Sequence, residues 1–545
     1  MRLDPTLLEP LNDVSQPMAE LEATSNGVNG TYSTERFVLR LSAEVHRLVD
    51  IAVADAAAGR TPSDEALQGY STYLHETVHW WQHIGSTAGF ILSLQHPAIA
   101  HVATRPLKDL VGTIGPIKPI KEWAETRRGR GLAAETMAQA NRAVNNTLDM
   151  RFFSRLMTSP DQAEHIVSHP YFNTVGHTYW MGFGHSLSVL SATIDREFSF
   201  LPDARRWDAG FERLRADGAP GFGEPETLSP VGLRHLMEGQ ARFAQLQFLS
   251  MASSEPPSME DLRSAGQLDG VYGAAYDLFL SQTGATAPER MDDPAIGLFM
   301  LILDLAINPT RGFPEQIEFF EEFFRDVDPG VRFLRLCAAA RNHPETHTVI
   351  RDYSRDEYLA VTGILTAACG FDHPITALRT ISGWTSEAQV RDLLEEKRLH
   401  RFKPDNLVIR VLFAYFVSFS ADKLRNPEFF CWPGAWKVSP RANARSVELW
   451  MKYLSLFTDK ADDDGVYPRT IVGIAEADLV RLLTDFIVNL MVYDLTHQWV
   501  LQPGHFVYPF SWVSQRLHPA ELEDGARRAF KMLFGVDPED FQTVR

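Results

Sequence analysis

Apolar residues recur at helical spacing through most of the chain, and alternating strand-like patterns are scarce. The segment 34–41 (TERFVLRL) is the clearest strand, because its apolar residues stand at every second position. Ser42 can cap a helix over 43–58, and the Thr-Pro-Ser-Asp run at 61–64 can begin another that reaches Ile84. The pattern predicts a mainly α protein with a minor sheet.

Helix-start and helix-stop signals continue to the end of the sequence. They predict further helices at 132–156, 185–198, 230–250, 259–281, 294–306, 315–325, 355–369, 386–400, 406–418, 444–458, 475–499 and 519–533. Turn-forming residues near the start predict a loosely ordered arm over 1–34. A Pro-containing break near Pro309 divides the remainder into a catalytic region, 35–308, and a helical C-terminal region, 309–545.

Composition narrows the class of protein. Lys and Arg number 52 and Asp and Glu 70, so the net charge is 52 − 70 = −18, which argues against a general nucleic-acid binder. Three cysteines cannot form a disulfide framework, which favours a reducing compartment. Two stretches without charged residues, 165–194 and 495–515, hold histidines and prolines that argue against membrane spans. We therefore expect a cytoplasmic protein with neither nucleic acid nor membrane as a partner.

The most informative motif is His75-Glu76-Thr77-Val78-His79, which lies inside the helix predicted to reach Ile84. Residues four apart point the same way on a helix, so His75 and His79 can bind one metal ion. Glu76 follows the first ligand directly and can accept a proton from a water molecule that the metal activates. This HExxH spacing is typical of zinc metallopeptidases.

A catalytic zinc site of this type needs a third protein ligand and keeps one position open for water. The best candidate is Glu238, which lies in the helix predicted at 230–250. The alternative is an ion pair between Glu238 and Arg242, which stand at the favourable i,i+4 spacing on a solvated face.

His75 to His79, followed later by Glu238-Gly239-Gln240-Ala241, resembles the gluzincin metallopeptidases, in which a HExxH helix packs beside a helix that carries a Glu ligand. The resemblance covers these two short segments. It implies Zn²⁺ as cofactor, His75, His79 and Glu238 as ligands and Glu76 as general base. It further implies a zincin-like catalytic core that hydrolyses peptides or proteins. The C-terminal region would then shape the cleft or bind a protein partner.

Peptide hydrolysis also needs a donor that stabilises the developing oxyanion. Tyr179, in the uncharged stretch 165–194, is the first candidate, and His185 and His235 are the next. The alternative is that Tyr179 is a core aromatic residue.

Two other classes of protein use the same residues differently. Helical bundles can hold di-iron carboxylate sites, and Glu76, His79, Glu238, Asp494 and His497 could form one in an oxygenase or oxidase. The chain could instead be a non-catalytic binding protein that keeps a vestigial metal site. Motifs for nucleotide binding or for a serine hydrolase are absent from the sequence.

Overall fold

The structure is a computed structural model, and it describes residues 4, 7, 29–127, 133–438, 442–510, 512–513 and 519–544. Helices account for 68% of it and strands for 5%, which confirms the prediction of a mainly α protein with a minor sheet. None of the helices among these residues is long and apolar enough to cross a membrane.

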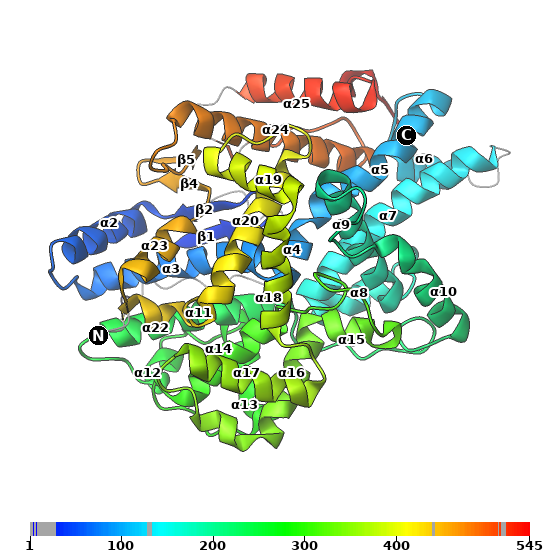
Figure 1. Ribbon diagram of the computed structural model, residues 1–545. Helices are drawn as coiled ribbons and strands as arrows, with labels where there is room; N and C mark the ends of the chain where they lie inside the picture. Colours follow the sequence, from blue (N-terminus) through cyan, green and yellow to red (C-terminus); the bar gives the residue numbers. More distant parts are fainter. Residues whose placement is uncertain are drawn as a thin grey trace.

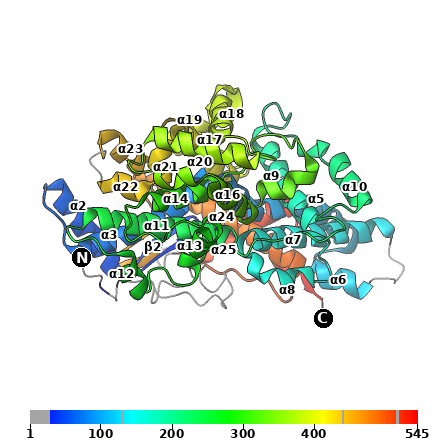
Figure 2. The same cartoon turned by 90° about the horizontal axis from the view of Figure 1, so that it is seen from below.

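Most of the chain lies in α-helices, which surround the sheet in Figures 1 and 2. Their bounds are α2 (Ala43–Ala57), α3 (Asp64–Gly85), α4 (Thr87–Ser93), α5 (Gln95–Ile114), α6 (Ile120–Arg127), α7 (Ala134–Thr158), α8 (Ala163–Val167), α9 (Val175–Ile194), α10 (Asp208–Asp217), α11 (Leu233–Ala252), α12 (Met259–Ser264), α13 (Val271–Thr283), α14 (Pro294–Ala306), α15 (Phe323–Val327), α16 (Pro329–Asn342), α17 (Arg355–Cys369), α18 (Pro374–Gly383), α19 (Ala388–Leu399), α20 (Leu407–Arg425), α21 (Pro427–Cys431), α22 (Pro433–Val438), α23 (Ala444–Lys452), α24 (Glu476–Leu501) and α25 (Pro519–Phe534).

The main sheet brings together residues near the start of the sequence and residues 457–468. Its strand order is β1 (Gly30–Ser33), β2 (Val38–Leu41), β4 (Phe457–Lys460) and β5 (Asp463–Pro468). The pairs β1–β2 and β4–β5 are antiparallel, whereas β2 and β4 are parallel, with Val38 opposite Phe457. A second sheet pairs β3 (Ile117–Lys118) with β6 (Gln542–Thr543) in parallel.

The strand predicted at 34–41 is wrong in its first half. Only Val38–Leu41 is a strand, and the residues before it form a turn in which Phe37 adopts a positive φ of 57°. Near the end of the predicted arm, Gly30–Ser33 forms the strand β1. Within that arm, Leu7 is buried and the backbone of Asp4 exchanges two hydrogen bonds with the Gln68 amide.

Two helix starts that a serine side chain caps are predicted correctly. Ser42 and Ser63 accept hydrogen bonds from the backbone three residues on and begin α2 and α3 as expected. The helix predicted at 259–281 is instead two helices, α12 and α13, because Gly266 and Gly270 between them adopt positive φ angles.

Three other predicted helices need correction at their ends. The helix predicted at 185–198 starts at Val175, since the Thr174 side chain caps it, and ends at Ile194. At 315–325 the first five residues are not helical, Phe320–Glu322 forms a 3-10 turn, and α15 starts only at Phe323. The end of the helix predicted at 444–458 lies outside α23, and residues 457–458 belong to β4.

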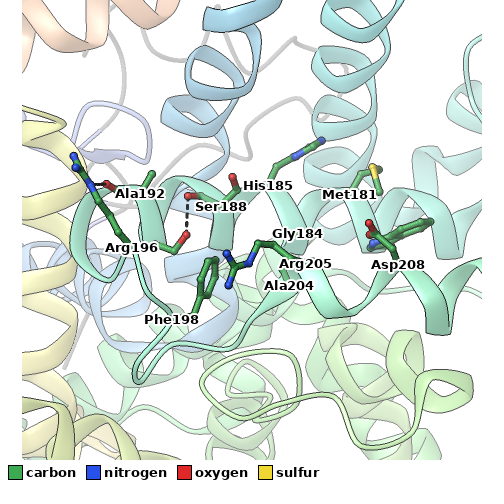
Figure 3. A pocket seen from close by; sticks show the side chains of 12 residues that line it. Met181, Gly184, His185, Ser188, Ala192, Arg196, Phe198, Ala204, Arg205 and Asp208 are labelled. Atoms are coloured by element: carbon green, nitrogen blue, oxygen red, sulfur yellow. Dashed lines mark hydrogen bonds between the residues drawn. The ribbon is translucent and has the colours of Figure 1, made fainter.

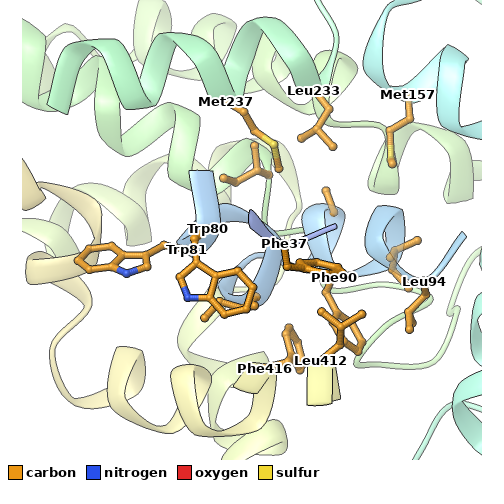
Figure 4. Packing of buried hydrophobic residues seen from close by; sticks show 14 of the residues in the cluster. Phe37, Trp80, Trp81, Phe90, Leu94, Met157, Leu233, Met237, Leu412 and Phe416 are labelled. Carbon is orange, nitrogen blue, oxygen red and sulfur yellow. The ribbon is translucent and has the colours of Figure 1, made fainter. Parts of the chain in front are cut away.

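Helix α3 lies between β1, α11 and α20, and its aromatic residues fill the space between them. Trp80 is fully buried against the ring of Tyr415, with ring centroids 5.7 Å apart. Figure 4 shows Trp80 and Trp81 between Met237 of α11 and Phe416 of α20. The predicted division at residue 308 stays a prediction, but residues on both sides of it share one sheet and one hydrophobic core.

Candidate metal centre

Two long helices bring three metal-ligating side chains together. His75 and His79 stand one turn apart on α3, and Glu238 projects from α11, which packs along α3. The Nε2 atoms of the two imidazoles are 3.0 Å apart. Glu238 Oε2 lies 3.5 Å from Nε2 of His75 and 3.3 Å from Nε2 of His79. The predicted ligands therefore converge on one point.

These spacings fit a tetrahedral zinc ion. Ligands at about 2.0–2.1 Å from a zinc centre lie about 3.3–3.4 Å from one another in a regular tetrahedron. The three spacings in the cluster, 3.0, 3.3 and 3.5 Å, bracket that value. The donor set of two imidazoles and one carboxylate is also one that catalytic zinc uses. Among the described residues, His75, His79 and Glu238 are the one group of three or more potential ligands that gather this closely.

The cluster is shielded on one side and accessible on the other. The side chain of His75 is 2% exposed and that of Glu238 is 25% exposed. Burial by itself raises the pKa of Glu238, but the charge of His79 and hydrogen bonds with both imidazoles outweigh it and hold that pKa well below its usual value. The Glu238 carboxylate is therefore ionised and available as a ligand.

The Glu238 carboxylate pairs with the two imidazoles, whereas the alternative placed it in an ion pair with Arg242. Arg242 is buried, donates to Gln245 and Gln267, and stacks 4.0 Å from the centre of the Tyr272 ring. The Tyr272 ring also meets the His75 ring edge to face, with centroids 6.0 Å apart. Tyr272, at the start of α13, thus lies against one of the candidate ligands.

Glu76 is buried where β1 crosses α3. A Cβ atom added to Gly30 of β1 would lie 2.9 Å from both Cγ and Oε1 of Glu76. Only glycine permits so close an approach of the strand to the helix. The end strand of the sheet therefore lies directly on the side chain expected to act as general base.

Tyr179 does not reach the cluster, so its assignment as oxyanion donor is wrong. It is fully buried, packs edge to face on Phe153 and Phe324, and donates its hydroxyl hydrogen to Asp328. Burial raises the pKa of Asp328 to about 6, although hydrogen bonds from Tyr179 and from backbone N–H groups partly oppose this. The alternative of a core aromatic residue describes Tyr179 correctly.

The other two donor candidates also lie outside the cluster. His185 lines a cavity of about 540 Å³ along α9 (Figure 3), and burial lowers its pKa to about 4. His235 stands in the first turn of α11, where its Nδ1 accepts a hydrogen bond from the Gly232 N–H. That contact gives His235 a structural role at the helix start.

Asp494 and His497, which a di-iron site would need, do not belong to the cluster. Asp494 on α24 pairs with His96, with 3.1 Å between Oδ1 and Nε2. Neither Asp494 nor His497 belongs to the group formed by His75, His79 and Glu238.

No known protein family, curated protein sequence or solved structure matches this chain. The functional inference therefore depends on the chemistry of the site. Sequence reasoning missed Gly30, Gln82 and Tyr272, whose importance arises from contacts between distant segments. Gln82 alone carried a signal, because it stands three residues after His79 on the same helix.

Proposed function

We propose that this protein is a zinc-dependent hydrolase that cleaves peptide bonds. The observation that carries the proposal is the convergence of His75, His79 and Glu238 at 3.0–3.5 Å from one another, directly beside a buried glutamate. His75, His79 and Glu238 would hold the ion. Zinc supplies Lewis-acid polarisation of the substrate carbonyl and acidifies a water molecule.

Glu76 moves the proton in the proposed reaction. Its carboxylate accepts a proton from the attacking water and later returns it to the leaving amine. The contact with Gly30 limits where the Glu76 side chain can lie. We propose Tyr272, in place of Tyr179, as the donor that stabilises the oxyanion, because its ring lies against that of the ligand His75.

The sheet supports a peptide as the substrate. β1 is an end strand, and it passes over Glu76. An extended peptide can add to such a strand through main-chain hydrogen bonds. A protein partner for residues 309–545 and a cytoplasmic location are further parts of the proposal, and the three buried, unpaired cysteines support the location.

Metal content and one conservative variant test the proposal. Purified protein should contain about one zinc per chain, and it should cleave members of a tryptic peptide library, detected as new termini by mass spectrometry. Glu76→Gln should retain zinc and lose about 10²- to 10⁴-fold in rate, since only the proton acceptor is removed.

The same measurements separate the other classes of protein. Two irons per chain and no cleavage would favour the oxidase. Neither metal nor cleavage in a folded protein would favour the binding protein with a vestigial site. Cleavage by Glu76→Gln at the wild-type rate would refute the assignment of the general base.

A further inference from the structure

The side chain of Gln82 connects the two helices that carry the metal ligands. Its Oε1 lies 2.8 Å from Nδ1 of His79, three residues earlier on α3. Its Nε2 donates to the backbone carbonyl of Met237, at 2.8 Å, and to Oε1 of Gln240, at 3.0 Å, both on α11. Met237 is the residue before the ligand Glu238. Gln82 is 3% exposed, so water does not replace these bonds.

This arrangement determines which nitrogen of His79 carries hydrogen. The carbonyl of Met237 can only accept, so the NH₂ group of Gln82 must face α11. The oxygen of the amide then faces His79, and because it can only accept, Nδ1 of His79 must be the protonated nitrogen. Nε2 is then the nitrogen that can offer a lone pair to a metal ion, and it is this atom that faces His75 and Glu238.

We infer that Gln82 is a positioning residue for the metal site, which rests on the proposed function. It holds His79 in the tautomer and ring orientation that ligation needs. It also fixes the position of α11 along α3 at which Glu238 can complete the ligand set. When a side chain that does not itself bind the metal orients a histidine ligand in this way, its loss typically lowers metal affinity by about 10- to 100-fold.

Zinc affinity of the full-length protein tests this inference directly. Metal-free protein is titrated with zinc against a chromophoric chelator, and the thermal midpoint is followed in parallel. Gln82→Met keeps the side-chain volume but removes all three hydrogen bonds, and should bind zinc about 10- to 100-fold more weakly. A cobalt-loaded sample should also show a shifted visible absorption spectrum.

The matched control is Gln95→Met on α5. Gln95 is equally buried, at 4% exposed, and its amide donates to Gly182 and Ser186 of α9. The variant should melt at a lower temperature but bind zinc as the wild type does. Equal losses of affinity in the Gln82 and Gln95 variants would mean that Gln82 matters only for packing, and would overturn the inference.

Gln82→Glu separates the two roles of the side chain. It keeps an acceptor for His79 Nδ1–H but loses the donors to α11, so it should melt at a lower temperature and still bind zinc more tightly than Gln82→Met. Wild-type affinity in Gln82→Met would overturn the inference and leave the proposed function intact. Failure of the wild type itself to bind zinc would instead refute the proposed function, together with the inference built on it.

Discussion

Two regions of this protein are rich in polar aromatic and histidine side chains, yet only one gathers them into a site. Along the contact between α3 and α11, three ligand atoms lie within 4.8 Å of one another. Along α9, the same residue types have separate partners: His177 pairs with Asp149 and Arg215, and Tyr179 bonds to Asp328. The difference shows that convergence of two elements, rather than local composition, makes the candidate site.

The physical reason lies in the hydrogen-bond partners that each side chain finds. A buried polar group needs a hydrogen-bond partner, and His177 and Tyr179 of α9 each find theirs in charged side chains of other segments. On α3, the Gln82 amide occupies Nδ1 of His79 and leaves Nε2 directed at two other potential ligands. Unlike the side chains of α9, those of α3 and α11 therefore meet at a point that an ion can fill.

The largest expected effect comes from removing one ligand. His79→Ala should bind zinc at least about 100-fold more weakly and lose hydrolysis, because loss of a ligand lowers affinity more than loss of a residue that only orients a ligand. His177→Ala, the matched change on α9, should leave zinc affinity unchanged. Equilibrium titration with a competing chelator measures both. A similar loss in His177→Ala would show that the comparison between the regions is wrong.

The next largest effect concerns the two tyrosines. Tyr272→Phe should lower kcat about 10²- to 10³-fold, as expected for an oxyanion donor, with zinc content unchanged. Tyr179→Phe should leave kcat unchanged, but should destabilise the fold by about 1–3 kcal/mol because the buried Asp328 loses its partner. Steady-state kinetics on a peptide cleaved by the wild type, together with denaturant unfolding, separates the two. Unchanged kcat in Tyr272→Phe would remove Tyr272 from the mechanism.

The comparison also explains how far sequence reasoning could go. His75, His79 and Glu76 follow from one helix period, and the structure brings His75, His79 and Glu238 together as predicted. Tyr179 was misassigned because a polar aromatic stretch looks the same whether its hydroxyl groups face a ligand or an aspartate in the core. Its partner Asp328 lies 149 positions away, and sequence spacing carries no signal over that distance.

The fold shows the same limit. Helices α2 and α3, which the side chains of Ser42 and Ser63 cap, could be placed from local chemistry. The sheet could not, because β2 pairs with β4 more than 400 residues later, and each strand is only four residues long. Strands this short have weak local patterns and form only where tertiary contacts supply a partner.

The smallest expected effect on zinc binding concerns Asp328, the partner of Tyr179, whose titration should change only the stability of the fold. The pKa of Asp328 is raised from 3.8 to about 6, so between these pH values the folded state keeps a proton that the unfolded state has lost. Stability from this group is therefore full well below pH 3.8 and falls by about 3 kcal/mol in total as the pH rises through 6. Asp328→Asn cannot ionise, so its free energy of unfolding relative to wild type should increase by that amount over the same interval.

Denaturant unfolding at pH 4, 5 and 6 measures the difference, and zinc affinity at pH 7 should be the same in both proteins. A constant difference across this range would show that Asp328 titrates normally, and a change in zinc affinity would show that α9 and the metal centre are coupled.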